Sequence, residues 1–270
     1  MILEPLINTH KIKYSIMDDL VKKMEIKKET ENINVYINLD SIFSQFYRDD
    51  IVDAIKSLNS DENVTLCSEI ANIAAHYRRY FWTRHNLRTT FYFYYMNKKP
   101  KYNRSLYPEY ADSLIEKKSK KNTRFTSVNS FINQNLKLFT ILSLYIPQVY
   151  FILSDGLEPA LIPFHFIKKS EDNDINLLLT KDEYEFQLVS RKNTYLLRMK
   201  YDKSDIIDRN NLFDYLLKKN KYEPLHHIDG KYFENILPMI SCKSRSVKSM
   251  KGYGKVSLLK KIDKNFDILD

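Results

Sequence analysis

Two glycines near the end of the chain have the spacing of a turn that can hold a phosphate group. Gly252 and Gly254 flank a single residue and precede a helical pattern over residues 256–262. Glycine lets a backbone turn tightly and approach a phosphate, and the amides at a helix N-terminus attract negative charge. Lys251 and Lys255 add positive charge on either side of the turn. Alone, such a glycine pair is usually just a turn. Together with the other motifs described below, it predicts contact with a nucleic-acid backbone, without reading of the bases.

Two further basic segments are candidates for the same kind of contact. The first mixes cations with aromatic rings, which suits single strands; its members are Arg78, Arg79, Arg84 and Arg88 with Tyr77, Tyr80, Phe81 and Trp82. The same pattern is equally consistent with a helix that buries its rings and leaves the arginines in water. The second is a basic loop that either binds nucleic acid or is merely solvated; its lysines are Lys117, Lys118, Lys120 and Lys121.

The overall composition is consistent with a polyanionic partner. There are 43 Lys and Arg against 34 Asp and Glu, a net charge of +9, which favours salt-sensitive association. Cys67 and Cys242 form neither a disulfide framework nor a zinc site, and they fit a reducing, cytoplasmic or host-intracellular compartment. The most apolar stretch, 138–153, is too short to span a membrane and is interrupted by Pro147. We therefore expect a soluble protein that is not secreted and has no membrane partner.

Elements that could position these residues are visible as alternating strand and helix patterns, which predict an α/β domain with a parallel sheet. The predicted strands are 34–40, 90–96, 148–153, 175–180 and, at an edge, 194–199. The predicted helices are 68–80, 129–145, 158–169 and 210–218. The first strand ends at Asp40, an acid at the carboxyl edge where sites form in parallel sheets.

Four short motifs occur in one order between residues 35 and 265. They are Asp40 after the first strand, KPKYNRSLYPEY at 99–110, Gly156-Leu157-Glu158 followed by residues 178–189, and the Gly252/Gly254 pair. This order resembles that of the flap endonuclease/5′–3′ exonuclease family, and LYPEY is the most specific match. The resemblance implies a PIN-like parallel sheet flanked by helices, with an arch segment at about 97–128. It also implies a C-terminal helix–hairpin–helix lobe and a nucleic-acid contact at Arg104.

The resemblance also implies a metal site, which is depleted here. The family cleaves phosphodiesters with two metal ions held by carboxylates. Three of the acids remain, Asp40, Glu158 and Asp182, and six are lost; the replacements include Met96, Tyr184, Cys242 and Arg245. The three acids could hold one Mg²⁺ or Mn²⁺ ion, with help from Asp155, Glu183 or Glu185. Alternatively they are relics that cap helices or accept backbone hydrogen bonds.

These observations divide the chain into a helical N-terminal extension (1–34), a PIN-like core (35–200) and a helical lobe (201–270). An apolar stripe of Ile12, Ile16, Leu20 and Met24 predicts the helix of the extension.

We expect a nucleic-acid-binding relative of the 5′ nucleases with little or no nuclease activity, acting as an accessory or structural subunit without a cofactor. Its expected partners are DNA as duplex, flap or single-strand junction, and other subunits of a viral replication or transcription assembly. The heavy use of Asn, Lys, Ile and Tyr indicates an AT-rich genome, such as that of a large virus or phage. The alternatives are an active, divergent Mg²⁺-dependent 5′ nuclease and a protein-binding scaffold of a viral assembly.

Overall fold

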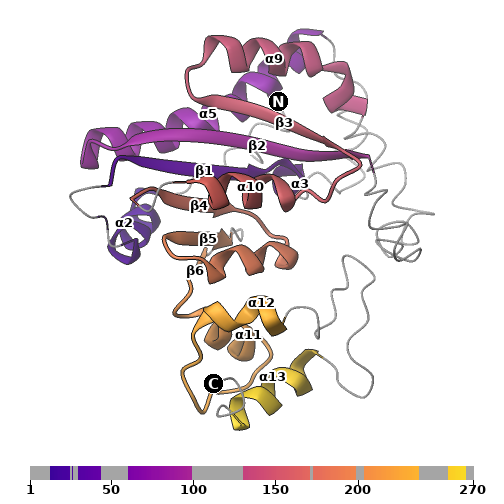
Figure 1. Ribbon diagram of the computed structural model, residues 1–270. Helices are drawn as coiled ribbons and strands as arrows, with labels where there is room; N and C mark the ends of the chain where they lie inside the picture. The colour runs from indigo at the N-terminus through magenta and orange to yellow at the C-terminus, as the bar shows by residue number, and fades with distance from the viewer. Residues whose placement is uncertain are drawn as a thin grey trace.

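A six-stranded sheet forms the centre of the molecule, in a computed structural model that describes residues 13–24, 26, 30–43, 60–98, 130–170, 173–198, 204–236 and 255–265. The strand order is β3-β2-β1-β4-β5-β6 (Figure 1). The first five strands run parallel and β6 pairs antiparallel with β5. The strands are β1 (Asn32–Asn38), β2 (Arg88–Lys98), β3 (Val149–Asp155), β4 (Ile175–Leu179), β5 (Thr194–Arg198) and β6 (Asp205–Ile207).

The strand β1 lies in the interior of the sheet and has one aliphatic and one polar face. Side chains alternate along a strand, so Ile33, Val35 and Ile37 share one face while Asn34, Tyr36 and Asn38 share the other. All six are buried. Buried polar side chains need hydrogen-bond partners, and those of β1 find them at the two ends of the neighbouring strands. The amide of Asn34 bonds Asp174 and Asn176 at the amino edge.

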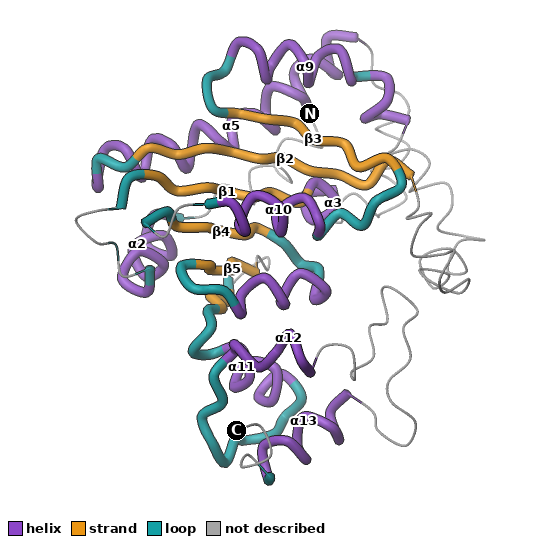
Figure 2. Tube along the Cα trace, in the orientation of Figure 1, coloured by secondary structure: helices purple, strands orange, loops and turns teal. Residues whose placement is uncertain are grey.

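Helices cover both faces of the sheet (Figure 2). The aliphatic face of β1 packs against one apolar cluster and the polar face against another. Helices of the first cluster are α2 (Tyr14–Lys23), α5 (Ser60–His85) and α9 (Leu136–Tyr145). Elements of the second are α10 (Leu161–Lys169), the 3₁₀ helix η2 (Glu183–Ser190), α11 (Leu212–Lys219), α12 (Phe233–Ile236) and α13 (Lys255–Lys264). The short helix α3 (Leu39–Phe43) directly follows β1.

The N-terminal helix α2 is part of the main core. Leu20 and Met24 are buried and Ile16 packs partly against the same cluster, as the stripe predicts, while Ile12 lies outside the described residues. Asp18 of α2 fixes the helix to α5, because its carboxylate accepts hydrogen bonds from the Tyr80 hydroxyl (2.5 Å) and from Arg84 (3.0 Å).

A tight contact in the C-terminal part joins the turn before α11 to the short 3₁₀ helix η3 (Gly230–Tyr232). Arg209 forms a two-pronged ion pair with Asp229, at 2.5 and 2.7 Å. The backbone N–H of Gly230 then donates to the Arg209 carbonyl oxygen at 2.8 Å. A Cβ atom at position 230 would lie 2.5 Å from that oxygen, so only glycine fits without movement of the backbone.

Replacement of Gly230 by alanine should therefore lower the free energy of unfolding by roughly 1–2 kcal/mol, the cost of a forced backbone shift. Chemical denaturation followed by circular dichroism measures the change. Lys231→Ala, at the exposed next position, is the matched control and should leave stability within about 0.5 kcal/mol. Equal midpoints for Gly230→Ala and the original chain would show that the contact is not tight in solution.

The predicted parallel sheet with flanking helices is confirmed, with three corrections in its details. The strand predicted at 194–199 is β5, but it does not lie at the edge, because β6 pairs on its outer side. The first strand ends at Asn38 rather than Asp40, which belongs to α3. Helix α5 is also much longer than the predicted helix 68–80. Charged residues in its first turn interrupt the apolar pattern on which the prediction of its start depended.

Candidate functional site at the carboxyl edge of the sheet

The carboxyl edge of the sheet contains a buried glutamate held by side chains from neighbouring strands. Asn38, the last residue of β1, donates its amide N–H to Oε1 of Glu185 at 2.7 Å. The hydroxyl of Tyr94 in β2 donates to Oε2 at 2.6 Å. Thr180, the residue after β4, also hydrogen-bonds the carboxyl group. Glu185 itself comes from η2, so four chain segments meet at this group.

The environment of Glu185 favours its neutral form. The side chain has no exposed surface. Its burial, followed by repulsion from the Asp182 carboxylate, raises the pKa of Glu185 to about 8, although hydrogen bonds from Tyr94, Thr180 and Asn38 act in the opposite direction. Desolvation disfavours a carboxylate because the charge loses its water. At neutral pH the group is therefore largely protonated and contributes little negative charge to this edge.

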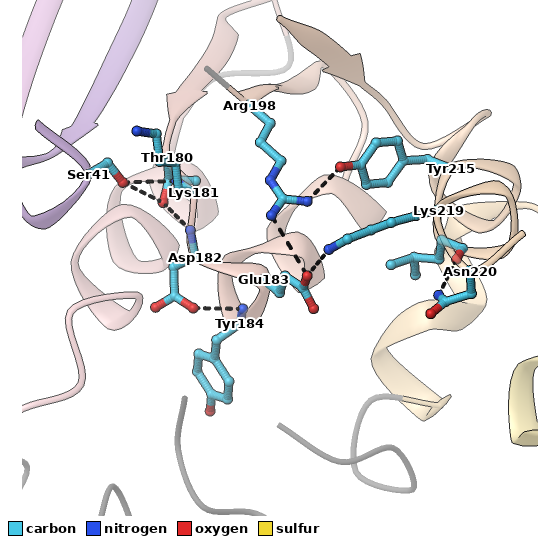
Figure 3. A network of polar contacts seen from close by, with 11 residues as sticks. Ser41, Thr180, Lys181, Asp182, Glu183, Tyr184, Arg198, Tyr215, Lys219 and Asn220 are labelled. Carbon is cyan, nitrogen blue, oxygen red and sulfur yellow. Dashed lines mark hydrogen bonds and ion pairs between the residues drawn. The ribbon is translucent and has the colours of Figure 1, made fainter. Parts of the chain in front are cut away.

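The loop between β4 and η2 is fixed by short polar contacts, which Figure 3 shows from close by. The hydroxyl oxygen of Ser41 in α3 accepts the N–H of Lys181 at 2.8 Å. The Thr180 hydroxyl oxygen accepts the N–H of Asp182 at 3.0 Å. The Asp182 carboxylate in turn accepts the N–H of Tyr184 at 3.0 Å and caps η2. Capping a helix is the structural role that we expected for an acid that does not bind metal.

Glu183, at the start of η2, is paired with cations from two other elements. It pairs with Lys219 of α11 and, at 3.9 Å, with Arg198 at the end of β5 (Figure 3). Arg198 also donates to the Tyr215 hydroxyl oxygen at 2.6 Å. Burial, with repulsion from Arg198, lowers the pKa of Lys181. The Glu183 carboxylate is therefore engaged by Lys219 and Arg198.

The three acids predicted as metal ligands lie on different segments. Asp182 precedes η2, and Glu158 is 2% exposed in the turn after β3, beyond Gly156, which has a φ of 86°. Asp40 lies in α3, but its side chain is outside the described part of the structure. No group of three or more His, Cys, Asp or Glu side chains within the described residues is placed to hold a metal ion.

Asn38 and Tyr94 are site residues that the sequence analysis did not single out. Both occupy strand positions on the face towards η2, and a simple count of two residues back from Asp40 or Met96 would have identified them. Together with Thr180 they supply neutral donors around the carboxyl group of Glu185. This described donor set does not fit a pair of Mg²⁺ ions, which require anionic oxygen ligands.

Few of the predicted nucleic-acid contacts fall on described residues. On α5 the rings of Tyr77, Tyr80 and Phe81 are fully buried and only Trp82 is exposed, at 55%. Arg78 is half-buried; it donates to the Pro147 carbonyl oxygen at 2.5 Å and lies over the Phe91 ring. The interleaved aromatic residues on α5 are thus mostly core.

The remaining predicted contacts divide between a few described residues and a larger undescribed set. Arg79 and Arg84 are exposed on α5, Arg88 is exposed at the start of β2, and Lys255 begins α13. The other positions lie outside the described residues; they are Arg104, Lys117, Lys118, Lys120, Lys121, Lys251, Gly252 and Gly254.

The mainly parallel sheet, its strand order and its helical layers define the 5′-nuclease fold. The structure is similar to the bacteriophage T5 flap endonuclease, solved as a pseudo-enzyme–product complex with DNA and metal ions, with a TM-score of 0.56, 11% identity and coverage of 88% of this chain and 78% of that one. A T5 protein co-crystallised with metal ions has a TM-score of 0.56 and 11% identity, with coverage of 88% of this chain and 77% of that one. The T5 5′-exonuclease with bound zinc has a TM-score of 0.55 and 12% identity, with coverage of 87% of this chain and 75% of that one.

This similarity concerns the fold, because the sequences have diverged far. No protein-family model matches the chain, and no curated protein matches it by sequence. Among the helices in the described ranges, none combines the length and the apolar character that crossing a bilayer requires.

Proposed function

We propose that this protein is a nucleic-acid-binding relative of the 5′ nucleases that has little or no nuclease activity and serves as an accessory or structural subunit. The observation that carries the proposal is the state of the carboxyl edge. There, the buried Glu185 is hydrogen-bonded to Asn38 and Tyr94 in surroundings that raise its pKa and disfavour its charged form, whereas a two-metal nuclease needs ionised carboxylates.

Electrostatics supports the same proposal. A pair of divalent cations is stable only beside enough negative charge, and beside the loop that follows β4 the Glu183 carboxylate is already paired with Lys219 and Arg198. An excess of positive charge instead attracts the phosphates of a nucleic acid without any metal ion. The net charge of +9 over the whole chain acts in the same direction. DNA as duplex, flap or single-strand junction is the expected partner.

A 5′-labelled flap substrate tests binding and cleavage separately. With Mg²⁺ or Mn²⁺ present, we expect binding at low salt that weakens steeply as salt rises, and no shortening of the labelled strand. Turnover that Asp40→Ala abolishes would overturn the proposal in favour of an active nuclease. Absence of binding even at low salt would overturn it in favour of a protein-binding scaffold.

The predicted contact at the Gly252/Gly254 turn provides a matched pair of variants for the binding arm. Lys251→Ala and Lys255→Ala together should weaken binding to all DNA sequences alike and reduce the salt dependence. Lys22→Ala together with Lys23→Ala, on the exposed end of α2, removes the same charge elsewhere and is the control. An equal effect of both pairs would show that net charge, not this turn, governs the binding.

A further inference from the structure

A row of stacked tyrosine rings crosses the sheet on the face covered by α10. Tyr36 of β1, Tyr92 of β2 and Tyr150 of β3 are direct cross-strand neighbours. The centroids of Tyr36 and Tyr92 lie 5.0 Å apart with an interplanar angle of 13°, and those of Tyr92 and Tyr150 lie 5.5 Å apart at 21°. Phe166 of α10 stacks on Tyr92 at 4.6 Å. Such cross-strand aromatic contacts stabilise a sheet, which accounts for the inner rings.

The outer end of this tyrosine row is open to solvent. Tyr36 is fully buried and Tyr92 is half-buried, whereas Tyr150 keeps 46% of its surface exposed. β3 is the last strand on this side of the described sheet, so no further strand there supplies a fourth ring (Figure 1). The stack behind Tyr150 holds its ring in place. A rigid aromatic surface loses little conformational freedom when a planar ligand stacks on it.

Exposed cations occur on two of the elements that contribute rings to this stack. Lys168 and Lys169 are exposed at the end of α10, shortly after Phe166, and Arg88 is exposed at the start of β2. Asp174, just before β4, is an acid on this side of the sheet, and its carboxylate accepts a hydrogen bond from Asn34 at 3.2 Å. Positive charge beside an exposed ring is the combination that binds single-stranded nucleic acid, where rings stack on bases and cations attract phosphates.

We propose that Tyr150, at the outer end of the Tyr36–Tyr92–Tyr150 row, is a stacking site for an unpaired base of a single-stranded nucleic acid, with Lys168, Lys169 and Arg88 attracting its phosphates. The site belongs to the amino half of the sheet, away from the carboxyl edge described above. It rests on the proposed nucleic-acid binding and adds to it an unpaired strand and a specific contact. Stacking tolerates any base, so the site does not select a sequence.

Fluorescence anisotropy with two labelled oligonucleotides of equal length tests this site, one with a normal base at every position and one with abasic sites in its centre. The original chain should bind the base-containing strand more tightly, by roughly fivefold or more. Tyr150→Ala should lose that difference while keeping its affinity for the abasic strand. Tyr150→Trp should restore it, because tryptophan offers a larger ring. Tyr145→Ala, at an 80% exposed position on α9, is the matched control and should change neither affinity.

The outcomes separate this inference from the proposed function. Binding of both strands by the original chain with no loss in Tyr150→Ala would overturn the stacking site and leave the proposed function intact. No binding of any nucleic acid at low salt would overturn both. A denaturation curve of Tyr150→Ala that matches the original chain shows that a lost affinity reflects the contact and not the fold.

Discussion

Replacing Glu185 by glutamine should stabilise the protein increasingly as the pH rises from about 5 to about 8. The folded-state pKa of about 8 lies above the ordinary glutamate value of roughly 4.3. Between these values the folded chain holds a proton that the unfolded chain has released. The contribution of Glu185 to stability is therefore greatest below pH 4.3 and falls with rising pH, by roughly 1 kcal/mol per pH unit. Glutamine is neutral at all these pH values, so the stability of Glu185→Gln does not fall for this reason.

Urea denaturation at a series of pH values measures the effect as a difference between the two proteins. The free energy of unfolding of Glu185→Gln minus that of the original chain should grow across this window and level off above pH 8. Glu223→Gln, whose side chain is 84% exposed, is the matched control for loss of a carboxyl group. A difference that stays flat would mean that Glu185 is ionised in the folded protein, as a metal ligand would be.

The alanine variant at the same position should be strongly destabilised at pH 5, and by less as the pH rises towards 8. Removing the side chain leaves the Asn38 amide and the Tyr94 hydroxyl without their partner inside the core. Each unsatisfied buried group costs about 1–3 kcal/mol, and the cavity adds to this. We therefore expect a loss of roughly 3–5 kcal/mol at pH 5 for Glu185→Ala, compared with a small change for Glu185→Gln.

Replacing Asp263 by alanine should release the end of α13 from the rest of the C-terminal part. Asp263 has no exposed surface, and its carboxylate accepts the backbone N–H groups of Leu225 and His226 at 3.0–3.2 Å. Hydrogen bonds to a charged acceptor are stronger than neutral ones. Loss of this acceptor should cost about 2–4 kcal/mol, since both N–H groups lose their partner.

Hydrogen exchange shows where the Asp263→Ala variant loosens. Amides of α13 and of Leu225 and His226 should exchange faster, while those of β1 and β2 should change little at moderate denaturant. Asp263→Asn keeps one acceptor oxygen and should recover part of the loss, and Lys264→Ala, exposed on the same helix, should behave like the original chain. Uniform acceleration across the sheet would contradict a local anchor. Since α13 follows the Gly252/Gly254 turn, we also expect weaker DNA binding.

The sheet was predictable from the sequence because its strands are strongly biased. Runs such as 90–96 and 175–179 are almost wholly apolar or aromatic, as strands covered on both faces must be. The short strand β6 lacks this signal: only Ile207 of its three residues is buried. It pairs with the outer edge of β5, and no pattern within its own three residues indicates a strand.

The candidate site was less predictable, because it depends on which acid lies in the interior. Glu183 and Glu185 are two positions apart and look alike in the sequence. In the structure, η2 turns Glu185 under the ends of β1 and β2, while Glu183 faces Lys219 near the surface. The same limit applies to Tyr77 and Tyr80, whose basic neighbours suggest a surface although both rings are fully buried.

The position of β1 within the sheet has a consequence for synthesis on the ribosome. Its neighbour on one side is β2, which follows within the same stretch of chain, but its neighbour on the other side is β4. Asn34 and Asn176, paired across β1 and β4, lie 142 positions apart. The growing chain therefore exposes an unpaired strand edge in its N-terminal part until more than half of the protein has been made. Such an intermediate folds slowly and exposes an edge prone to aggregation.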